Sequence, residues 1–393
     1  MYKRQAEYNP FHNGHLYHLK KSLEKTDAEV SVAVISGNLT QRGQFPIADK
    51  WTRAETAVRC GVDLVVEMPV IYSCNSAGYF AASGVEILEN LGVDFISFGS
   101  EAGDIRNLKE QAAFLSEWQN EIEQAVKMAV KQGLTYPRAR QEVLEKMGTA
   151  GAKAAAFLKD PNNILALEYL RHMKKAEGVT IKREGPGYNE EKALGTFAPA
   201  SYIRNCIRQK EDIRSWVPAM TLKKLQSRAD VTEERFFQMI LQKCFSSSAE
   251  ELENLAAAGE GLGNKVKDSL RYCRSYEELV DELKSKRYTR SRICRLLGQA
   301  LVGITADDMA FGKNYVRVLA FNEKGSGYLK KVKKQGLCNL PVITNINREL
   351  PRFPEIRTTI EKDILVSDLY NLAAGRDLYL HSDFVETVRI CMR

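Results

Sequence analysis

Three of the five histidines in this chain of 393 residues lie close together, at His12, His15 and His18. His12 and His15 are three positions apart, so they share a face on the first turns of a helix. Free backbone N–H groups and the helix dipole favour an anion at that place. The imidazoles can stabilise charge on a departing pyrophosphate, and Gly14 between them lets a base or ribose approach the backbone. The pattern indicates nucleotidyl transfer from ATP.

A structural interpretation also exists for each of these histidines. His12 could cap the helix, His15 could be buried and His18 could be an exposed helical residue; from the residues alone we assign His18 a structural role. A metal site is disfavoured because no nearby carboxylate pair or cysteine completes a coordination sphere. The eight cysteines form no Cys-x-x-Cys pair, which indicates reduced, mostly packing thiols.

The elements that must position the histidines follow a βαβ rhythm. Short β-branched runs at residues 30–35, 63–67 and 94–98 alternate with helical segments near residues 14–24, 49–60, 76–91 and 105–131. This alternation predicts a Rossmann-like α/β fold with an open, doubly wound parallel sheet. Such sheets bind ligands at the carboxyl ends of their strands, where residues 9–15, 36–43 and 98–101 fall. We therefore expect three turn-rich segments to converge on one rim.

The second half of the chain differs from the first in pattern and in charge. From about residue 216 helix-forming stretches dominate, with some strand returning near residues 340–344, so we expect a catalytic domain at 1–215 and a mainly helical domain at 216–393. The net charge of +7 is concentrated there, in residues 284–295 and 328–334. Such runs are typical of surfaces that bind phosphate backbones, although a solvated helix face is the alternative. No apolar run approaches a membrane span and no signal peptide is visible, so we expect a cytoplasmic protein.

Several segments together resemble one known family. They are residues 7–18, 36–43, 50–53, 61–67, 98–101, 161–165, 182–185 and 286–289. In this order they resemble the bacterial tRNA(Met) cytidine acetate ligases, a branch of the HIGH-type nucleotidyltransferases. The resemblance implies that ATP and acetate give acetyl-adenylate and pyrophosphate. The N4 amine of the wobble cytidine in elongator tRNA(Met) then takes the acetyl group.

The resemblance also implies the residues of the site. His12 and His15 are expected to be catalytic. The expected ATP-binding residues are Ala6, Glu7, Tyr8, Asn9, Pro10, Phe11, His12, Asn13, Gly14, His15, Leu16, Tyr17, His18, Gly99, Asn162, Asn163, Arg183, Ser201 and Arg204. Ser201 and Arg204 are similar to the Ser/Thr-x-Ile-Arg element that HIGH-type enzymes use on phosphates. Magnesium is expected to accompany ATP because it screens the phosphates, but no carboxylate cluster marks a dedicated metal site.

For some of these residues an ordinary structural role is the alternative. Gly99 could merely turn the chain, Asn162 could cap a helix and Arg183 could sit in a surface ion pair. Gln41, Arg42 and Lys50 belong to the rim where acetate or pyrophosphate would bind, but the sequence assigns them no firm role.

The basic run is the expected tRNA-binding segment. Its candidate contacts are Lys284, Lys286, Arg287, Arg290, Arg292 and Arg295, interleaved with Tyr288. Two other functions fit parts of the chain. A small-molecule adenylyltransferase would share the histidine pair but leave the basic half unexplained. A non-catalytic RNA-binding protein would leave the intact histidine motif unexplained.

The start of the chain departs from the family pattern. Relatives reach the histidine motif from an apolar first strand, whereas residues 1–6 here are short and polar. We expect this segment to be a poor central strand and the weakest part of the predicted sheet.

Overall fold

The computed structural model describes residues 2–184, 193–226, 231–285, 287–376 and 381–392, with residues 2–6 described by their backbone. One sheet organises the chain, in the strand order β5-β4-β1-β2-β3-β6-β7, with β8 also paired to β6. The five parallel strands of the first half are β1 (Tyr2–Ala6), β2 (Ser31–Ser36), β3 (Leu64–Met68), β4 (Phe95–Ser100) and β5 (Glu177–Lys182). This confirms the predicted parallel α/β sheet.

The first strand occupies the middle of this sheet. β1 pairs with β2 along its whole length, from Tyr2 opposite Ser31 to Ala6 opposite Ile35, and with β4 at Tyr2 and Lys3. The expectation that this polar segment would make a poor central strand was wrong. The strand ladder uses main-chain groups, and the buried strand β2 supplies partners whatever side chains β1 carries. As a result the segment at residues 7–15, called the histidine loop below, starts at the carboxyl edge of the sheet.

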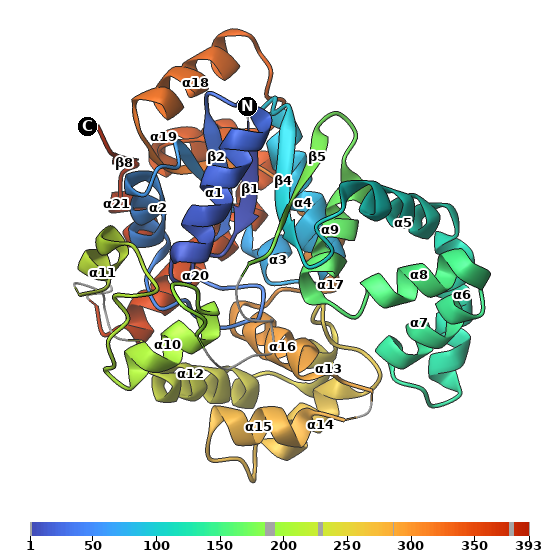
Figure 1. Cartoon of the computed structure of the whole chain (residues 1–393). Coiled ribbons are helices and arrows are strands. Elements are labelled where there is room, and N and C mark those ends of the chain that lie inside the picture. The colour runs from blue at the N-terminus through green and yellow to red at the C-terminus, as the bar shows by residue number, and fades with distance from the viewer. Residues whose placement is uncertain (1, 185–192, 227–230, 286, 377–380, 393) are drawn as a thin grey trace.

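Both faces of the sheet are covered by helices, as a doubly wound fold requires. Val32 and Val34 of β2 belong to the core under α4 (Ala77–Asn90), α5 (Ile105–Glu117) and α9 (Pro161–His172). Ala33 and Ile35 belong to the core under α1 (Asn13–Thr26) and α2 (Lys50–Arg59). Because successive side chains of a strand point to opposite faces, a continuous apolar run fills both cores. Figure 1 shows α1 and α2 in front of the sheet.

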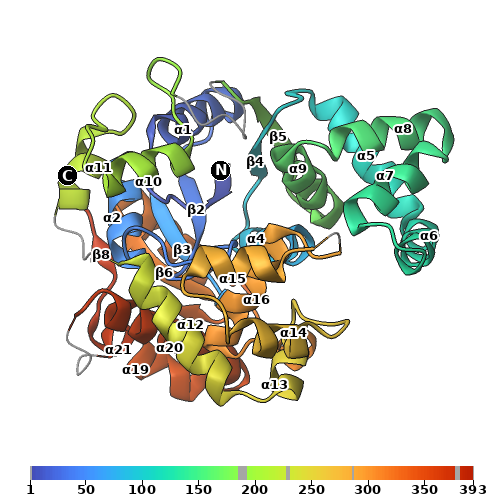
Figure 2. The same cartoon turned by 90° about the horizontal axis from the view of Figure 1, so that it is seen from below.

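A helical insertion separates β4 from β5. It contains α5 and then α6 (Gln119–Lys131), α7 (Tyr136–Glu145) and α8 (Gly148–Phe157). Figure 2 shows this insertion projecting from the β5 edge, away from the rest of the chain. The chain then returns through α9 to β5.

The second half adds both helices and strands. β6 (Val316–Phe321) joins β3 in antiparallel fashion, and β7 (Val342–Ile343) and β8 (Arg389–Ile390) pair in parallel with β6. β7 confirms the strand expected near residues 340–344. The division at residue 215 stays a prediction, and the sheet itself crosses it.

The remaining helices lie mostly in this half. They are α3 (Val70–Ser73), α10 (Ala200–Arg208), α11 (Ala219–Gln226), α12 (Glu233–Ser246), α13 (Ala249–Glu253), α14 (Leu262–Ser269), α15 (Tyr276–Leu283), α16 (Arg290–Val302), α17 (Ala306–Phe311), α18 (Glu323–Lys334), α19 (Ile346–Glu349), α20 (Arg357–Ala373) and α21 (Ser382–Val385), with 3₁₀ turns at Leu350–Arg352 and Pro354–Ile356. Figure 1 shows α10, α12 and α16 below the sheet, on the side of its carboxyl ends. Across the described ranges, no helix is both long enough and apolar enough to span a membrane.

Candidate active site

The histidine pair forms a stacked unit at the start of α1. His12 is the N-cap residue, with an extended backbone, and its N–H donates to Nδ1 of His15 at 3.2 Å. The two rings stack with centroids 3.7 Å apart and planes 23° from parallel. Because Nδ1 of His15 accepts this bond, the neutral ring carries its hydrogen on Nε2. His15 can therefore donate to an anion at the helix N-terminus.

Gly14 leaves room for the ring of His12. A Cβ at this position would lie 3.0 Å from Cε1 and 3.1 Å from Nδ1 of His12. From the sequence we expect Gly14 to let a base or ribose approach the backbone. The structure adds that a side chain at Gly14 would press directly on the His12 ring.

Two buried aromatic rings hold His15 from behind. The ring centroid of His15 lies 5.0 Å from that of Tyr8 and 5.5 Å from that of Phe11, and both aromatic side chains are buried. Tyr8 and Phe11 also contact one another, with centroids 4.8 Å apart. The peptide bond between Asn9 and Pro10 is cis. These residues of the expected ATP set position the imidazole.

Asn9 and Asn13 attach neighbouring segments to the histidine loop. The Asn9 side-chain oxygen accepts from the N–H of Ile47 at 2.9 Å. The N–H of Asn13 donates to the Trp216 carbonyl at 2.9 Å, and its side-chain amide donates to the carbonyls of Thr196 and Ser215 at 3.1 and 3.0 Å. The loop is therefore tied to the segments before α2 and on both sides of α10.

Arg53 of α2 joins the ends of two strands and is a residue that sequence reasoning missed. Its buried guanidinium donates to the carbonyls of Glu7 at 2.6 Å and Ala48 at 2.9 Å, and to that of Gly37. Burial lowers the pKa of Arg53 below its usual value. The only sequence signal was its place in the segment at residues 50–53. Glu7, in turn, accepts from the N–H of Gln41 at 2.8 Å through its side chain.

Arg204 reaches the histidine loop from α10. Its guanidinium donates to the Asn9 carbonyl at 2.8 Å. Burial lowers the pKa of Arg204 to about 10, with Glu7 opposing that shift and Arg42 adding to it. Ser201, three residues earlier on the same helix, is exposed. The structure thus brings Arg204 next to the loop that carries His12 and His15.

Gly99, His18 and Arg183 meet at the end of β4. A Cβ on Gly99 would lie 3.5 Å from Cγ of Arg183 and 4.0 Å from Cδ2 of His18. His18 is buried, and its ring nitrogens lie 3.4 Å from the hydroxyls of Ser22 and Ser97. These contacts give His18 a positioning role within α1, in line with its structural assignment from the residues.

Asn162 and Asn163 bind the end of β4. The side-chain amide of Asn162 donates to the Glu101 carboxylate at 2.6 Å, and the N–H of Asn163 donates to it at 2.9 Å. The Asn163 side-chain oxygen accepts from the N–H groups of Glu101 and Ala102 at 3.0 and 3.2 Å. Glu101 therefore caps the start of α9, and both asparagines hold the rim together.

The expected tRNA-binding run is divided between surface and interior. Arg290 pairs with Glu277 at 2.5 Å, while Arg292 donates to the carbonyls of Ala257 at 2.9 Å and Ala258 at 2.7 Å. Burial lowers the pKa of Arg295.

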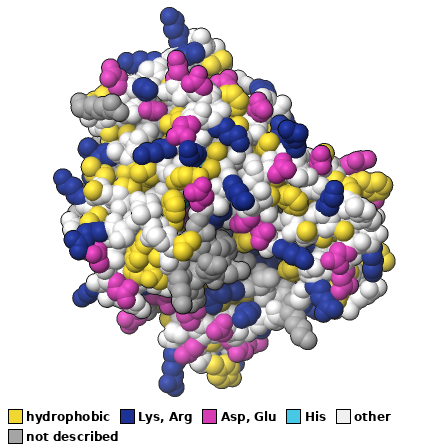
Figure 3. Space-filling view, in the orientation of Figure 1, with side chains coloured by type: hydrophobic (Ala, Val, Ile, Leu, Met, Phe, Trp, Pro, Cys, Tyr) yellow, Lys and Arg dark blue, Asp and Glu magenta, His cyan; other side chains and the backbone are white. Residues whose placement is uncertain are grey.

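The rest of the run lies on the surface or outside the described residues. Lys284 and Arg287 are exposed, Tyr288 is buried and Lys286 lies outside the described residues. Figure 3 shows Lys and Arg side chains interspersed with Asp and Glu on the face it presents. The basic run is therefore not a continuous exposed stripe.

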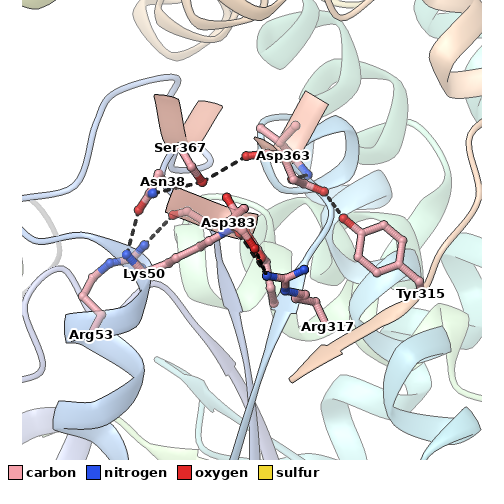
Figure 4. Close-up of polar contacts among 11 residues, drawn as sticks. Asn38, Lys50, Arg53, Tyr315, Arg317, Asp363, Ser367 and Asp383 are labelled. Atoms are coloured by element: carbon pink, nitrogen blue, oxygen red, sulfur yellow. Dashed lines mark hydrogen bonds and ion pairs between the residues drawn. The ribbon is translucent and has the colours of Figure 1, made fainter. Parts of the chain in front are cut away.

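Lys50 lies in a buried ionic network below the rim. Its ammonium is 2.9 Å from Glu67 and 2.8 Å from Asp383, and Arg317 also contacts Asp383 at 3.2 Å (Figure 4). Burial alone lowers the pKa of Lys50, but the carboxylates of Asp383 and Glu67 raise it above the usual value. Lys50 therefore ties α2 to β3 and to the end of the chain. Among the described residues, no group of three or more His, Cys, Asp or Glu could hold a metal ion.

Known proteins resemble this chain over nearly its whole length. The family described as HIGH Nucleotidyl Transferase matches residues 5–381. The tRNA(Met) cytidine acetate ligase of Caldanaerobacter subterraneus subsp. tengcongensis is 40% identical over 384 residues, which cover 94% of each chain. The enzyme of the same name from Thermoanaerobacter sp. strain X514 is 38% identical over 396 residues, or 97% of each chain.

Two crystal structures of Thermotoga maritima TmcAL have the same fold. The apo form matches with a TM-score of 0.92 and the form bound with alpha-thio ATP with 0.90. Each is 29% identical, and the match covers 100% of this chain and 99% of that one. From its sequence match and its shared fold, this chain belongs to the HIGH nucleotidyltransferase family.

Proposed function

We propose that this protein is a tRNA(Met) cytidine acetate ligase, which activates acetate with ATP and acetylates the wobble cytidine of elongator tRNA(Met). The observation that carries the proposal is the stacked pair of His12 and His15 at the start of α1, with Arg204 bound to the same loop. It stands in a chain whose curated relatives bear this activity in their name. The ATP analogue in the Thermotoga maritima structure supports ATP as the nucleotide.

In the first step a carboxylate oxygen of acetate attacks the α-phosphorus of ATP. The bond to the bridging oxygen breaks, and pyrophosphate leaves with that electron pair. His15 donates from Nε2 to the phosphate oxygens, where negative charge builds in the transition state, and the N-terminus of α1 adds its positive dipole. Arg204 supplies a fixed positive charge on the same side. Mg²⁺ enters as part of the ATP substrate, screening its phosphates.

In the second step the N4 amine of the cytidine attacks the acetyl carbonyl carbon. The carbon–oxygen bond to AMP breaks and its electron pair leaves with AMP, the amine loses a proton to the solvent, and N4-acetylcytidine and AMP are released. The base must leave its stack for its amine to reach the adenylate. The helices α12 and α16 of the second half lie on the side of the carboxyl ends (Figure 1), which supports this half as the tRNA-binding part.

Within the basic run we assign the RNA contacts to its first part. Lys284 and Arg287 are exposed there, whereas Arg290, Arg292 and Arg295 bind other parts of the protein or are largely buried. Because the proposed substrate is a tRNA, we expect the enzyme to act in the cytoplasm.

The proposal is tested by ATP–pyrophosphate exchange in the presence and absence of acetate. We expect exchange that depends on acetate and proceeds without tRNA, because adenylation precedes transfer. Exchange that requires a phosphorylated small molecule in place of acetate would instead identify a small-molecule adenylyltransferase.

A further inference from the structure

The buried guanidinium of Arg53 lies where the histidine loop meets the end of β2. Nη1 donates to the carbonyl of Glu7 at 2.6 Å, Nη2 donates to that of Gly37, and Nε donates to that of Ala48 at 2.9 Å. These carbonyls belong to the start of the histidine loop, the residue after β2 and the segment that leads into α2. One planar side chain therefore sets the spacing of three segments of main chain.

All three of these acceptors are neutral. Among the described residues, no ion pair joins Arg53 to a carboxylate. Two carboxylates whose charge acts on Arg53, those of Asp49 and Glu67, are paired with other cations. Burial lowers the pKa of Arg53, so the surroundings oppose the charge held there. A buried guanidinium of this kind is a poor way to stabilise a fold, and its three bonds point to a role in positioning.

The helix that carries Arg53 is itself fixed at its first residue, Lys50. The ammonium of Lys50 lies 2.9 Å from Glu67 of β3 and 2.8 Å from Asp383. The main-chain N–H of Lys50 donates to the side-chain oxygen of Asn38 at 2.7 Å. Lys50 and Arg53 are three positions apart on α2, and Figure 4 shows both beside Asn38. Arg53 is therefore held on a helix that cannot shift without breaking buried ion pairs.

The stacked histidines follow Glu7 in the same loop. The N–H of His12 donates to Nδ1 of His15 at 3.2 Å, which leaves the hydrogen of the neutral His15 ring on Nε2. A shift at the start of the loop would disturb this bond and the direction in which His15 donates. Because a displacement of about 1 Å at a reacting group can cost roughly 100-fold in rate, the spacing set by Arg53 matters for the chemistry.

We propose that Arg53 is a positioning residue for the adenylation step, which holds the histidine loop against the end of β2 so that His15 donates in one fixed direction. This inference rests on the proposed function. Arg53 acts on the reaction through the main-chain carbonyls that it binds, and it touches no substrate.

The test compares Arg53→Lys and Arg53→Gln with Arg59→Lys in the full-length protein. Arg59 is a matched control because it lies on α2, is exposed and donates to Glu55 at 2.8 Å. Both Arg53 variants should lower kcat of acetate-dependent exchange by about 10- to 100-fold while KM for ATP changes by less than about threefold. Lysine keeps the charge but not the planar fork, so it should restore little of the rate. Arg59→Lys should leave both constants unchanged.

The rate is expressed per ATP-binding site, counted by calorimetry, so that a loss of folded protein does not count as a loss of rate. An unchanged kcat per site in Arg53→Gln would show that Arg53 serves stability alone. Full activity of Arg53→Lys would assign the effect to charge and not to position. A rise in KM for ATP at unchanged kcat would show that Arg53 acts on ATP binding. Each of these three results overturns the inference.

A second variant is used if neither Arg53 variant folds. Asn38→Ala removes the bond that ties the N–H of Lys50 to the residue after Gly37. It should lower kcat per site by roughly tenfold without a rise in KM for ATP, because the same joint is loosened from its other side. An unchanged kcat in Asn38→Ala would then overturn the inference.

NMR spectra of isotope-labelled histidine test the positioning without turnover. In the wild type, the ring hydrogen of His15 should be on Nε2, with its signals assigned by their loss in His15→Ala. Both Arg53 variants should show a mixture of the two tautomers, and a wild-type spectrum in both overturns the inference. If the wild type shows no acetate-dependent exchange, the proposed function fails, and the spectra still decide whether Arg53 positions the histidine loop.

Discussion

The histidine loop and the basic run at residues 284–295 both attract notice in the sequence, yet they use their polar groups differently. In the histidine loop the bonds to neighbouring segments come from Asn9 and Asn13, and the ring of His15 stacks on that of His12. In the basic run the guanidinium of Arg292 donates to the carbonyls of Ala257 and Ala258 within the protein. A spaced motif at a strand-to-helix turn therefore predicts how its residues are arranged, whereas a run of charge does not show which of its side chains are exposed.

The largest expected effect is at His15. His15→Ala should slow acetate-dependent ATP–pyrophosphate exchange by about 10²- to 10³-fold, because it removes a donor to the charge that develops in the transition state. His172→Ala is the matched control, since His172 lies at the end of α9 beside Glu168. Binding of tRNA, measured by filter retention, should stay near normal in both. Full activity of the His15→Ala variant would show that His15, like Arg292 of the basic run, has only a structural role.

Arg292 and Arg287 test which residues of the basic run stabilise the fold and which bind tRNA. Arg292→Ala should lower the free energy of unfolding by about 1–2 kcal/mol, because two partly buried carbonyls lose a charged donor. Arg287→Ala should change stability by less than about 0.5 kcal/mol but reduce the salt dependence of tRNA binding by about one unit of slope. Urea unfolding measures the change in stability, and tRNA binding at several salt concentrations measures the change in slope. The opposite pattern would show that Arg292 faces the RNA.

The contact between Gly298 of α16 and Gly43 tests whether α16 positions the turn at residues 40–47, whose Gln41 N–H donates to Glu7 of the histidine loop. Gly298→Ala should reduce exchange by roughly tenfold, because the added Cβ must push the turn at Gly43 or the helix aside. Gly327→Ala, on α18, is the control, since nothing lies within 4 Å of its added Cβ. In a helix that substitution stabilises by about 0.5–1 kcal/mol. Equal activity of both variants would show that the contact between α16 and the turn at Gly43 does not affect catalysis.

The smallest effect concerns Asp49, which caps α2 below the rim. Burial alone raises the pKa of Asp49, but bonds from Thr52 and the charge of Arg376 outweigh it and lower the pKa. The carboxylate therefore stabilises the fold above the ordinary aspartate pKa, and this is lost as pH falls through the lowered value.

Asp49→Asn should cost about 1 kcal/mol or less at pH 7, because Arg376 is partly exposed. The difference from wild type in urea unfolding curves should shrink as pH falls below the ordinary aspartate pKa of about 4, and it should vanish only below the lowered pKa of Asp49. A difference that persists in acid would assign the effect to the cap and not to the charge.

Much of the rim was predictable because it depends on local order. Segments 9–15, 36–43 and 98–101 lie at the carboxyl ends of the neighbouring strands β1, β2 and β4, and the bond from Gln41 to Glu7 joins the ends of β1 and β2. What could not be predicted depends on distant parts of the chain. β6 adds to β3 across some 250 residues, and Lys50 is neutralised by Asp383 near the far end.

Which residues of the basic run are exposed could not be predicted for a different reason. A helix turns its residues through both an exposed and a buried face, so Arg292 and Arg295, three apart, share the inward side. Composition counts their charge without reporting which face they occupy. Similarly, the polarity of residues 2–6 says nothing of the main-chain pairing that places β1 in the sheet.

The most direct test of the account is nucleoside analysis of elongator tRNA(Met) after incubation with the protein, ATP and labelled acetate. We predict labelled N4-acetylcytidine at the wobble position, with one AMP and one pyrophosphate formed for each acetyl group. Unlabelled tRNA, or label that appears without ATP, would contradict the account.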